Sequence, residues 1–248
     1  LNISTAAAIV ASSAGVTIAK HGNRSVSSKS GSADVLEKLG IKIDLKSKKI
    51  EQTLIDKKFC FMFAPLYHSA MKNVGPVRKE LETRTIFNVL GPLLNPANTK
   101  KQLIGVYEKK LVSTHINILK KLKSSHVLVV HGFDGLDEIS LSEKSYIAEL
   151  RNDKIKNYIF NPEDIGYSLI DINEIKGGDS NYNAKEILKM LNNENKSFQK
   201  IVEINSGAAI YLSGMANSIK EGAEIAKKNI ENGTSKKFLN SLIEYSKF

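Results

Sequence analysis

The chain of 248 residues contains a single cysteine, so it cannot form an internal disulfide. That residue, Cys60, lies in the apolar run at 59–63. A cysteine in such a run is typical of a buried thiol, and a chain without disulfides fits a reducing compartment. We therefore predict a cytoplasmic protein with a core thiol at this position.

Long hydrophobic runs are also missing, and no apolar stretch is long enough to span a bilayer. Residues 6–19 resemble the apolar core of a signal peptide, but no basic segment precedes them and Ser12 and Ser13 interrupt the run. The chain has no internal repeat and no long low-complexity linker. It opens at Leu1, without a methionine and directly into predicted structure, so we expect an amino-terminal portion to be missing.

Acidic residues are fewer than basic ones, 26 Asp and Glu against 36 Lys and Arg, which gives a net charge of +10. Such an excess permits binding of nucleic acid or of an anionic substrate. The lysines, however, occur in scattered pairs on predicted helices rather than in one block. Scattered pairs are typical of solvated faces, so the charge by itself favours a lysine-rich surface over a dedicated groove.

Hydrophobic patterning predicts an α/β fold over residues 1–248. Strands are predicted over 16–20, 59–64, 101–107, 126–131, 144–150 and 155–160. Helices are predicted over 5–14, 33–39, 47–58, 109–123, 183–192, 197–213, 217–231 and 235–246, with a proline-interrupted helical stretch over 66–94. Uninterrupted apolar strands predict a central, largely parallel sheet with helices on both faces, beside a helical flank. The last two strands alternate and predict a hairpin.

The most informative segment is polar and covers residues 20–34, directly after the first predicted strand. It contains three cations, two glycines and five serines. Glycine lets backbone N–H groups approach a ligand, serine adds hydroxyl donors, and Lys or Arg neutralises negative charge. This composition predicts a phosphate or pyrophosphate site. The alternative is a solvated linker, which is less favoured because a strand and a helix border the segment.

Two further segments carry the residue types of a phosphate and metal site. Asn2, Ser4 and Thr5 lie at a helix start, where free N–H groups attract anions and a hydroxyl can reach a metal; simple helix capping is the alternative. Asp137 and Glu138 follow the strand at 126–131, where doubly wound sheets place ligands. Their carboxylates suit Mg²⁺ and lack the Cys and His neighbours of a zinc site, although turn chemistry is the alternative.

A fourth segment, residues 65–78, contributes a cation and a histidine. Arg78 could pair with a carboxylate in bidentate fashion, although a lone arginine on a helix is more often a surface residue. His68, like His21 and His131, could be a structural histidine with its hydrogen bonds satisfied. No Ser-His-Asp arrangement is evident in the sequence.

These segments, in this order, resemble the anthranilate phosphoribosyltransferase family. The similarity includes residues 2–5, 20–34, 76–78, 85–96 and 131–138, and it extends to 205–209 and 221–223. It covers essentially the whole chain. The resemblance implies a fold like those of nucleoside phosphorylases and phosphoribosyltransferases, with 66–98 as a helical hinge and substrate segment. It also implies transfer of the phosphoribosyl group of phosphoribosyl pyrophosphate (PRPP) to anthranilate, with Mg²⁺ and release of pyrophosphate, in tryptophan biosynthesis.

The resemblance also implies roles for individual residues. Ser4, Asp137 and Glu138 would hold Mg²⁺, and Asn23, His68 and Arg78 would bind anthranilate. The PRPP-binding residues would be Asn2, Ile3, Ser4, Thr5, Lys20, His21, Gly22, Asn23, Arg24, Ser25, Val26, Ser27, Ser28 and Ser32.

The family's Gly-Thr-Gly-Gly-Asp loop and its amino-terminal helical domain would precede Leu1. We therefore expect this chain to be an incomplete, weakly active fragment of a protein that forms a homodimer when complete.

Two alternatives remain open from the sequence. A nucleic-acid-binding relative without transferase activity would explain the basic charge, but it would not need Asn23, Arg78 and the acidic pair. A nucleoside phosphorylase would need a nucleobase pocket, and the close similarity of residues 20–34 to the family's motif argues against it. Neither nucleic acid nor a membrane is therefore expected as a partner.

Overall fold

The computed structural model describes residues 1–25, 29–68, 80 and 85–247. The strands are β1 (Ile18–Gly22), β2 (Phe59–Phe63), β3 (Lys101–Gly105), β4 (His126–Gly132), β5 (Ser145–Arg151) and β6 (Lys154–Phe160). The α-helices are α1 (Ile3–Ser13), α2 (Ser32–Lys38), α3 (Ser47–Lys57), α4 (Ala64–Tyr67), α6 (Ile86–Leu90), α7 (Lys109–Lys121), α8 (Ser180–Leu191), α9 (Lys196–Ser213), α10 (Ile219–Glu231) and α11 (Thr234–Lys247). Short 3₁₀ helices are η1 (Gly91–Leu93), η2 (Pro162–Ile165) and η3 (Ile172–Ile175).

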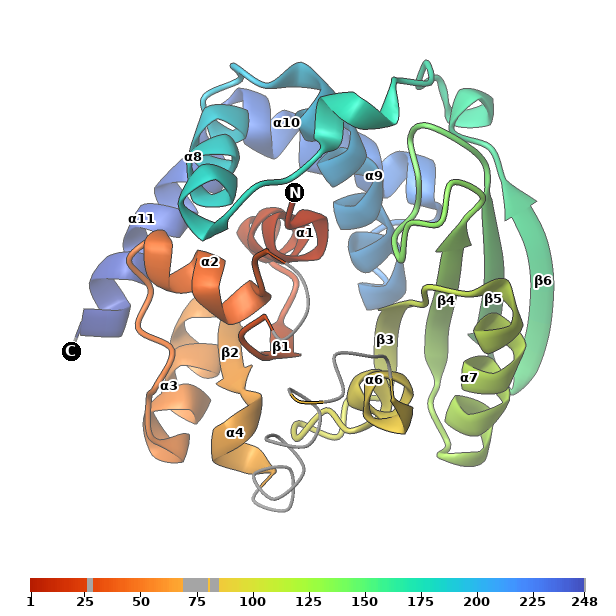
Figure 1. Ribbon diagram of the computed structural model, residues 1–248, viewed down its shortest axis with the longest axis horizontal. Coiled ribbons are helices and arrows are strands. Elements are labelled where there is room, and N and C mark those ends of the chain that lie inside the picture. The colour runs from red at the N-terminus through yellow and green to blue at the C-terminus, as the bar shows by residue number, and fades with distance from the viewer. Residues whose placement is uncertain (26–28, 69–79, 81–84, 248) are drawn as a thin grey trace.

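The described strands form two sheets (Figure 1). Strands β1 and β2 are parallel, with Ile18 opposite Phe59 and Gly22 opposite Phe63. The second sheet has the order β3-β4-β5-β6, in which only β3 and β4 are parallel. The predicted α/β class is confirmed. The parallel pairing of β3 with β4, the strands before and after helix α7, is confirmed as well. The described strands do not, however, join into one continuous sheet.

Strand β4 explains why an uninterrupted apolar run predicts a strand that is covered on both faces. Val127 and Val129 pack with α7 in one hydrophobic cluster. Leu128 and Val130, which point to the opposite face, belong to the main core together with residues of α9. Successive side chains of a strand alternate between faces, so only a strand between two helical layers can be apolar at every position.

The predicted hairpin is confirmed between β5 and β6. Arg151 pairs with Lys154, and the two residues between them, Asn152 and Asp153, have φ values of 51° and 62°. Positive φ at both central positions is the signature of a type I′ turn, which matches the twist of the flanking strands, and Asn and Asp tolerate it well.

Helices α1, α8 and α10 pack around α9, on the side of the mixed sheet opposite α7, and α11 packs against α1 and α10 (Figure 1). Helices α9 and α10 approach so closely that Gly207 and Gly222 cannot be replaced by larger residues without a shift. A Cβ at Gly207 would lie 2.4 Å from the backbone nitrogen of Ala223. None of the helices in the described ranges is long and apolar enough to cross a membrane.

Candidate active site

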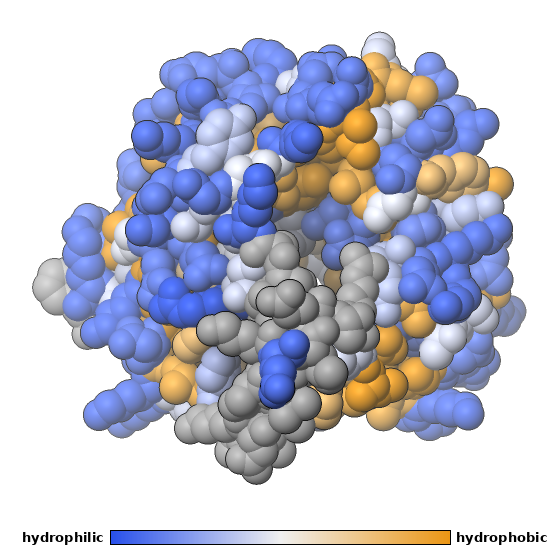
Figure 2. All heavy atoms as spheres, in the orientation of Figure 1, coloured by the Kyte–Doolittle hydropathy of each residue, from blue (hydrophilic) through white to orange (hydrophobic). Residues whose placement is uncertain are grey.

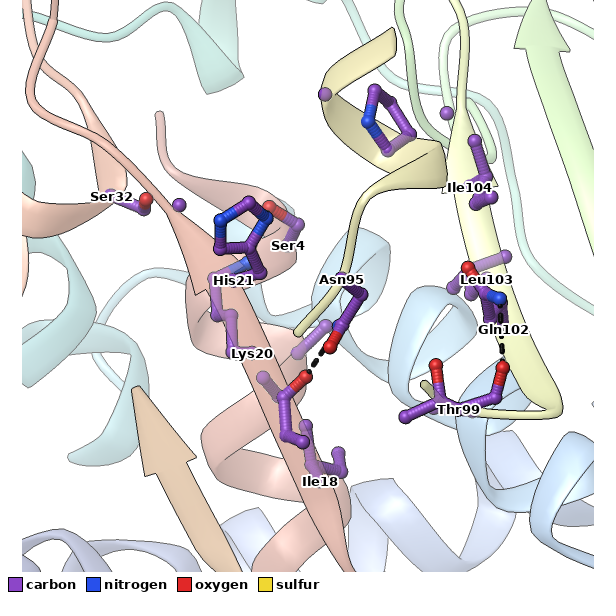
Figure 3. Close-up of a pocket in the computed structure, with 18 of the residues that line it drawn as sticks. Ser4, Ile18, Lys20, His21, Ser32, Asn95, Thr99, Gln102, Leu103 and Ile104 are labelled. Atoms are coloured by element: carbon purple, nitrogen blue, oxygen red, sulfur yellow. Dashed lines mark hydrogen bonds between the residues drawn. The ribbon is translucent and has the colours of Figure 1, made fainter. Parts of the chain in front are cut away.

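A cavity of about 1220 Å³ lies between the two sheets. Strand β1 lines one wall and strand β3 the other, while Asn95 reaches in between them (Figure 3). Figure 2 shows a hollow on this face, with apolar side chains gathered at its upper margin and hydrophilic surface on either side. An apolar cavity with a few polar groups brought together at one end is typical of a small-molecule site.

The cavity brings together most of the residues predicted from the sequence. Of the predicted site residues, those that line it are Asn2, Ser4, Lys20, His21, Gly22, Asn23, Arg24, Ser25, Ser32, His68, Asp137 and Glu138. Ile3 and Thr5 are instead buried in α1 and are not among the lining residues. Val26, Ser27, Ser28 and Arg78 lie outside the described residues, as do all of 69–79 and 81–84 in the predicted 66–98 segment.

The acidic pair lies at the start of helix α1, although 134 positions separate Glu138 from Ser4. The backbone N–H of Ser4 donates a hydrogen bond to Glu138 Oε1 over 3.2 Å. Lys20 Nζ, from β1, donates to the hydroxyl of Ser4 over 3.2 Å. Three segments that are distant in sequence thus bring a cation, a hydroxyl and carboxylates to one point.

Burial, and the repulsion between the carboxylates of Asp137 and Glu138, dominate the electrostatics around Glu138. Burial, with the negative charge of Asp137 beside it, raises the pKa of Glu138 to about 8. Burial also lowers the pKa of Lys20, while the charges of Glu138 and Asp137 act in the opposite direction. Two neighbouring carboxylates that share one lysine attract a further cation, because a cation would stabilise the charged form of both acids.

The donor set at this point is made of oxygen ligands. Asp137 and Glu138 supply carboxylate oxygens and Ser4 supplies a hydroxyl, which are the hard ligands that Mg²⁺ prefers. The described residues contain no group of three or more His, Cys, Asp or Glu that could hold a metal. This residue set therefore fits an ion that keeps water and substrate phosphate among its ligands, as Mg²⁺ does, rather than a fully caged metal.

The polar loop after β1 is held by Asp34 of helix α2. One carboxylate oxygen of Asp34 accepts hydrogen bonds from the N–H groups of Ser25 and Gly31, both at 2.9 Å. Gly31 must be glycine, because a Cβ there would lie 2.4 Å from the backbone nitrogen of Ser25. The two described ends of the loop, at Ser25 and Gly31, are therefore held together near the carboxyl end of β1.

Arg24 contacts helix α2 as well as the cavity. Its guanidinium donates to Glu37 Oε1 over 2.7 Å and to Asp34 Oδ1 over 3.2 Å. These carboxylates raise the pKa of Arg24, so its charge is already matched by acidic residues of helix α2. The described geometry therefore assigns Arg24 a part in holding the loop, beside its predicted part in binding phosphate.

His21, near the end of β1, forms a hydrogen-bonded pair with His68. Their Nε2 atoms lie 3.2 Å apart, so one ring must donate and the other accept. Burial, helped by the nearby His68 and Lys20, lowers the pKa of His21 to about 4. His21 is therefore neutral at neutral pH, and it gives the cavity a polar group without adding a positive charge.

Acidification is expected to destabilise the protein through His21. The unfolded chain takes up this proton near pH 6.5, but the folded protein only near pH 4. Between these values the unfolded state binds more protons, so the stability that this residue contributes is complete above pH 6.5 and is lost as the pH falls. His21→Gln should therefore reduce the loss of unfolding free energy between pH 7 and pH 5, measured by urea denaturation. His131→Gln is the control, and an equal pH dependence in both variants would contradict this assignment.

Three residues contribute to the cavity although the sequence assigns them no role. Asn95 Nδ2 donates to the carbonyl of Ala19 over 3.0 Å and so attaches the segment after η1 to β1 (Figure 3). Gly105, the last residue of β3, touches the backbone of Asp137. Asn205 of α9 binds the backbone next to the acidic pair. Asn95 and Asn205 lie within the segments that resemble the family, and this was the only signal available for them.

Comparisons with known proteins agree with this geometry. Residues 1–236 match the model of the glycosyl transferase family, α/β domain. An anthranilate phosphoribosyltransferase of Thermoanaerobacter sp. (strain X514) is 46% identical over 246 residues, which cover 99% of this chain and 73% of that protein.

Solved structures give the same result. The crystal structure of anthranilate phosphoribosyltransferase from Thermus thermophilus matches all of this chain and 74% of its own, with a TM-score of 0.92 and 35% identity. The enzyme from Saccharomyces cerevisiae in complex with PRPP and Mg matches 99% of this chain and 69% of its own, with a TM-score of 0.88 and 29% identity. The chain therefore belongs to the glycosyl transferase family and, within it, to the anthranilate phosphoribosyltransferases.

Proposed function

We propose that the cavity between β1 and β3 binds PRPP with Mg²⁺ together with anthranilate, and that it transfers the phosphoribosyl group to the anthranilate amine. The observation that carries the proposal is the meeting of Ser4, Lys20 and the acidic pair in one cavity with the polar loop. The relative from Saccharomyces cerevisiae, whose structure is in complex with PRPP and Mg, supports it.

Ser4, Asp137 and Glu138 would hold Mg²⁺ in this proposal. When bound, the ion would stabilise the negative charge of the pyrophosphate leaving group. Lys20 donates to the hydroxyl of Ser4 and would add positive charge beside the two carboxylates. In a cavity shielded from water, such preorganised charge lowers the barrier more than it would in solution.

The remaining predicted residues would position the two substrates. The N–H groups at the start of α1 and the glycine- and serine-rich loop would hold the phosphates and ribose of PRPP. As the bond between ribose C1 and pyrophosphate breaks, positive charge develops on the sugar and the anthranilate amine attacks the same carbon. Pyrophosphate leaves with the electron pair of the broken bond, and the amine, now bonded to the sugar, gives its extra proton to water. Holding the amine close to this carbon supplies most of what the reaction needs, so no covalent enzyme intermediate is required.

Anthranilate would be held by Asn23, His68 and Arg78. Asn23 and His68 line the cavity. A guanidinium pairs with a carboxylate through two parallel hydrogen bonds, so Arg78 is the natural partner of the anthranilate carboxylate. His21, which is neutral and lies beside His68, would add no positive charge for that carboxylate.

Arg78→Ala is expected to raise the KM for anthranilate by about 100-fold, because a lost charge-assisted bidentate contact is worth about 3 kcal/mol. The KM for PRPP should change little. Steady-state kinetics with each substrate varied in turn make the comparison, and Arg78→Lys tests whether two parallel hydrogen bonds are needed. Equal increases in both KM values would remove Arg78 from the anthranilate site.

Calorimetry with PRPP, with and without Mg²⁺, is the test of the proposed function. We expect binding that requires Mg²⁺, together with pyrophosphate release only when anthranilate is also added. A gel shift on single-stranded DNA addresses the nucleic-acid-binding alternative, which the comparisons do not favour. Salt-dependent DNA binding without turnover would overturn the proposal.

We further propose that the complete protein is a homodimer and acts in the cytoplasm. Both follow from the family resemblance and, for the location, from the lone cysteine. Cys60 is buried, and burial raises its thiol pKa to about 12, as expected for an unreactive core residue. Sedimentation of the complete protein would test the homodimer.

A further inference from the structure

A buried asparagine holds the backbone directly after the acidic pair. Asn205, in the middle of α9, accepts a hydrogen bond from the N–H of Ile139 through Oδ1 over 3.0 Å. Its Nδ2 donates to the carbonyl oxygen of the same residue over 2.9 Å. Asn205 and Ile139 are both 0% exposed. The side-chain amide thus pairs with one residue of the β4–β5 connection as a neighbouring strand would.

The first of these bonds acts directly on Glu138. The N–H of Ile139 belongs to the peptide group that also contains the carbonyl carbon of Glu138. Holding that plane restricts the ψ rotation of Glu138, and with it the directions in which its side chain can leave the chain. The other end of the same side chain meets the N–H of Ser4. Glu138 is therefore anchored through its backbone by α9 and through its carboxylate by α1.

Asparagine is a costly choice at this position if packing alone is considered. It forms helices poorly, and a polar amide in an apolar core is unfavourable unless its hydrogen bonds are made. Asn205 makes a third bond, from Nδ2 to the carbonyl of Ile201 over 2.9 Å, so its donors are used. No apolar side chain of similar size offers a donor and an acceptor side by side to match a peptide group.

The rest of the connection is held by separate contacts. Asp134 accepts hydrogen bonds from the hydroxyls of Ser140 and Ser142 and from the N–H of Leu136. These contacts close the turn before the acidic pair and the turn after it, but none of them touches the peptide group between Glu138 and Ile139. Among the side chains that the structure describes, that of Asn205 is the one that hydrogen-bonds to this peptide group.

We propose that Asn205 is a positioning residue of the active site, which holds the Glu138 carboxylate in the direction needed for Mg²⁺. This inference rests on the proposed function. It assigns a role within the reaction to a residue that contacts neither PRPP nor anthranilate in the proposal. Groups that orient metal ligands typically change metal affinity by about 10–100-fold when they are removed.

Asn205→Asp and Asn205→Ser test the proposal in the full chain. Asn205→Asp keeps the shape of the side chain but loses the Nδ2 donor. Asn205→Ser shortens the side chain and removes both hydrogen bonds to Ile139. We expect the half-saturating Mg²⁺ concentration to rise by about tenfold or more in each variant, while the KM for anthranilate stays within about twofold. A readout without turnover is calorimetric binding of magnesium pyrophosphate, which should weaken to the same degree.

Ser206→Ala is the matched control. Ser206 is the next residue of α9, is equally buried, and donates to the carbonyls of Val202 and Ala7 without touching the acidic connection. The Ser206→Ala variant also loses a buried hydrogen-bonding group of α9, but it should leave the Mg²⁺ requirement unchanged. If Ser206→Ala shifted the Mg²⁺ requirement as much as the Asn205 variants do, Asn205 would have only a structural role and the proposal would be overturned.

Hydrogen exchange of the wild-type protein supplies a test that needs no variant. The amide of Ile139 should exchange slowly, and more slowly still with magnesium pyrophosphate. Fast exchange there would overturn the proposal even if neither variant folds. If wild-type turnover and pyrophosphate binding do not depend on Mg²⁺, the proposed function itself fails. If the wild type depends on Mg²⁺ and the Asn205 variants have the same half-saturating Mg²⁺ concentration as the wild type, only this inference fails.

Discussion

Replacing Asp137 by Asn and Glu138 by Gln together is expected to abolish Mg²⁺-dependent turnover, with a fall in kcat of at least about 1000-fold. The two carboxylates are the only acidic side chains among the described residues that line the cavity. Without them Lys20 and Ser4 remain, and neither attracts a divalent cation. A 1000-fold loss corresponds to about 4 kcal/mol of transition-state stabilisation, which is within the range of metal catalysis.

The double variant is expected to fold. Removing the charges relieves the repulsion and the burial cost that raise the pKa of Glu138 to about 8. Glu163→Gln combined with Asp164→Asn is the matched control, because these residues also form an adjacent acidic pair but are exposed in η2. Initial rates over a Mg²⁺ titration make the comparison. Turnover within tenfold of the wild type in the double variant would exclude the acidic pair as the metal site.

Gly105→Ala is expected to have the second largest effect. A Cβ on Gly105 would lie 1.5 Å from the backbone carbonyl oxygen of Asp137. That atom belongs to the backbone, so strand β3 and the acidic connection would have to move apart. Overpacking of this kind costs about 3 kcal/mol, because the surrounding core cannot yield freely. The displaced connection should also raise the requirement for Mg²⁺.

Urea denaturation of Gly105→Ala beside Gly91→Ala measures this effect. Gly91 has a helical φ of −46°, and an added Cβ there would have nothing within 4 Å. The control should therefore stay within about 0.5 kcal/mol of the wild type. If Gly105→Ala lost no more stability than the control, β3 and the acidic connection would not be in the close contact described here.

Several elements of the fold are predictable because their signals are local. The hairpin between β5 and β6 follows from an Asn-Asp pair between two alternating strands. The βαβ unit of β3, α7 and β4 follows from two short strands with apolar centres on either side of an amphipathic helix. The helices from 180 onward begin and end within a few residues of their predicted bounds. In each case nearest neighbours in the sequence supply most of the physical constraint.

The division of the strands into two sheets was not predictable in the same way. Strands β1 and β3 are less apolar and less buried than β2 and β4, but nothing in their residues says which edges stay unpaired. Strand neighbours are chosen by the packing of the layers that cover them, here α1 and α9. The cavity lies where the two sheets face each other, so its location could not be predicted either.

The residue types of the candidate site were available from the sequence, since a glycine- and serine-rich loop, a helix start and an acidic pair each have a composition that suggests phosphate or metal chemistry. Their meeting was decided by the tertiary structure alone, which places Ser4 against Glu138 across 134 positions. The same holds for Asn205, whose partner Ile139 is 66 positions away. Composition and periodicity act over a few residues, whereas hydrogen bonds between distant segments exist only once the core has packed and brought their backbones within about 3 Å.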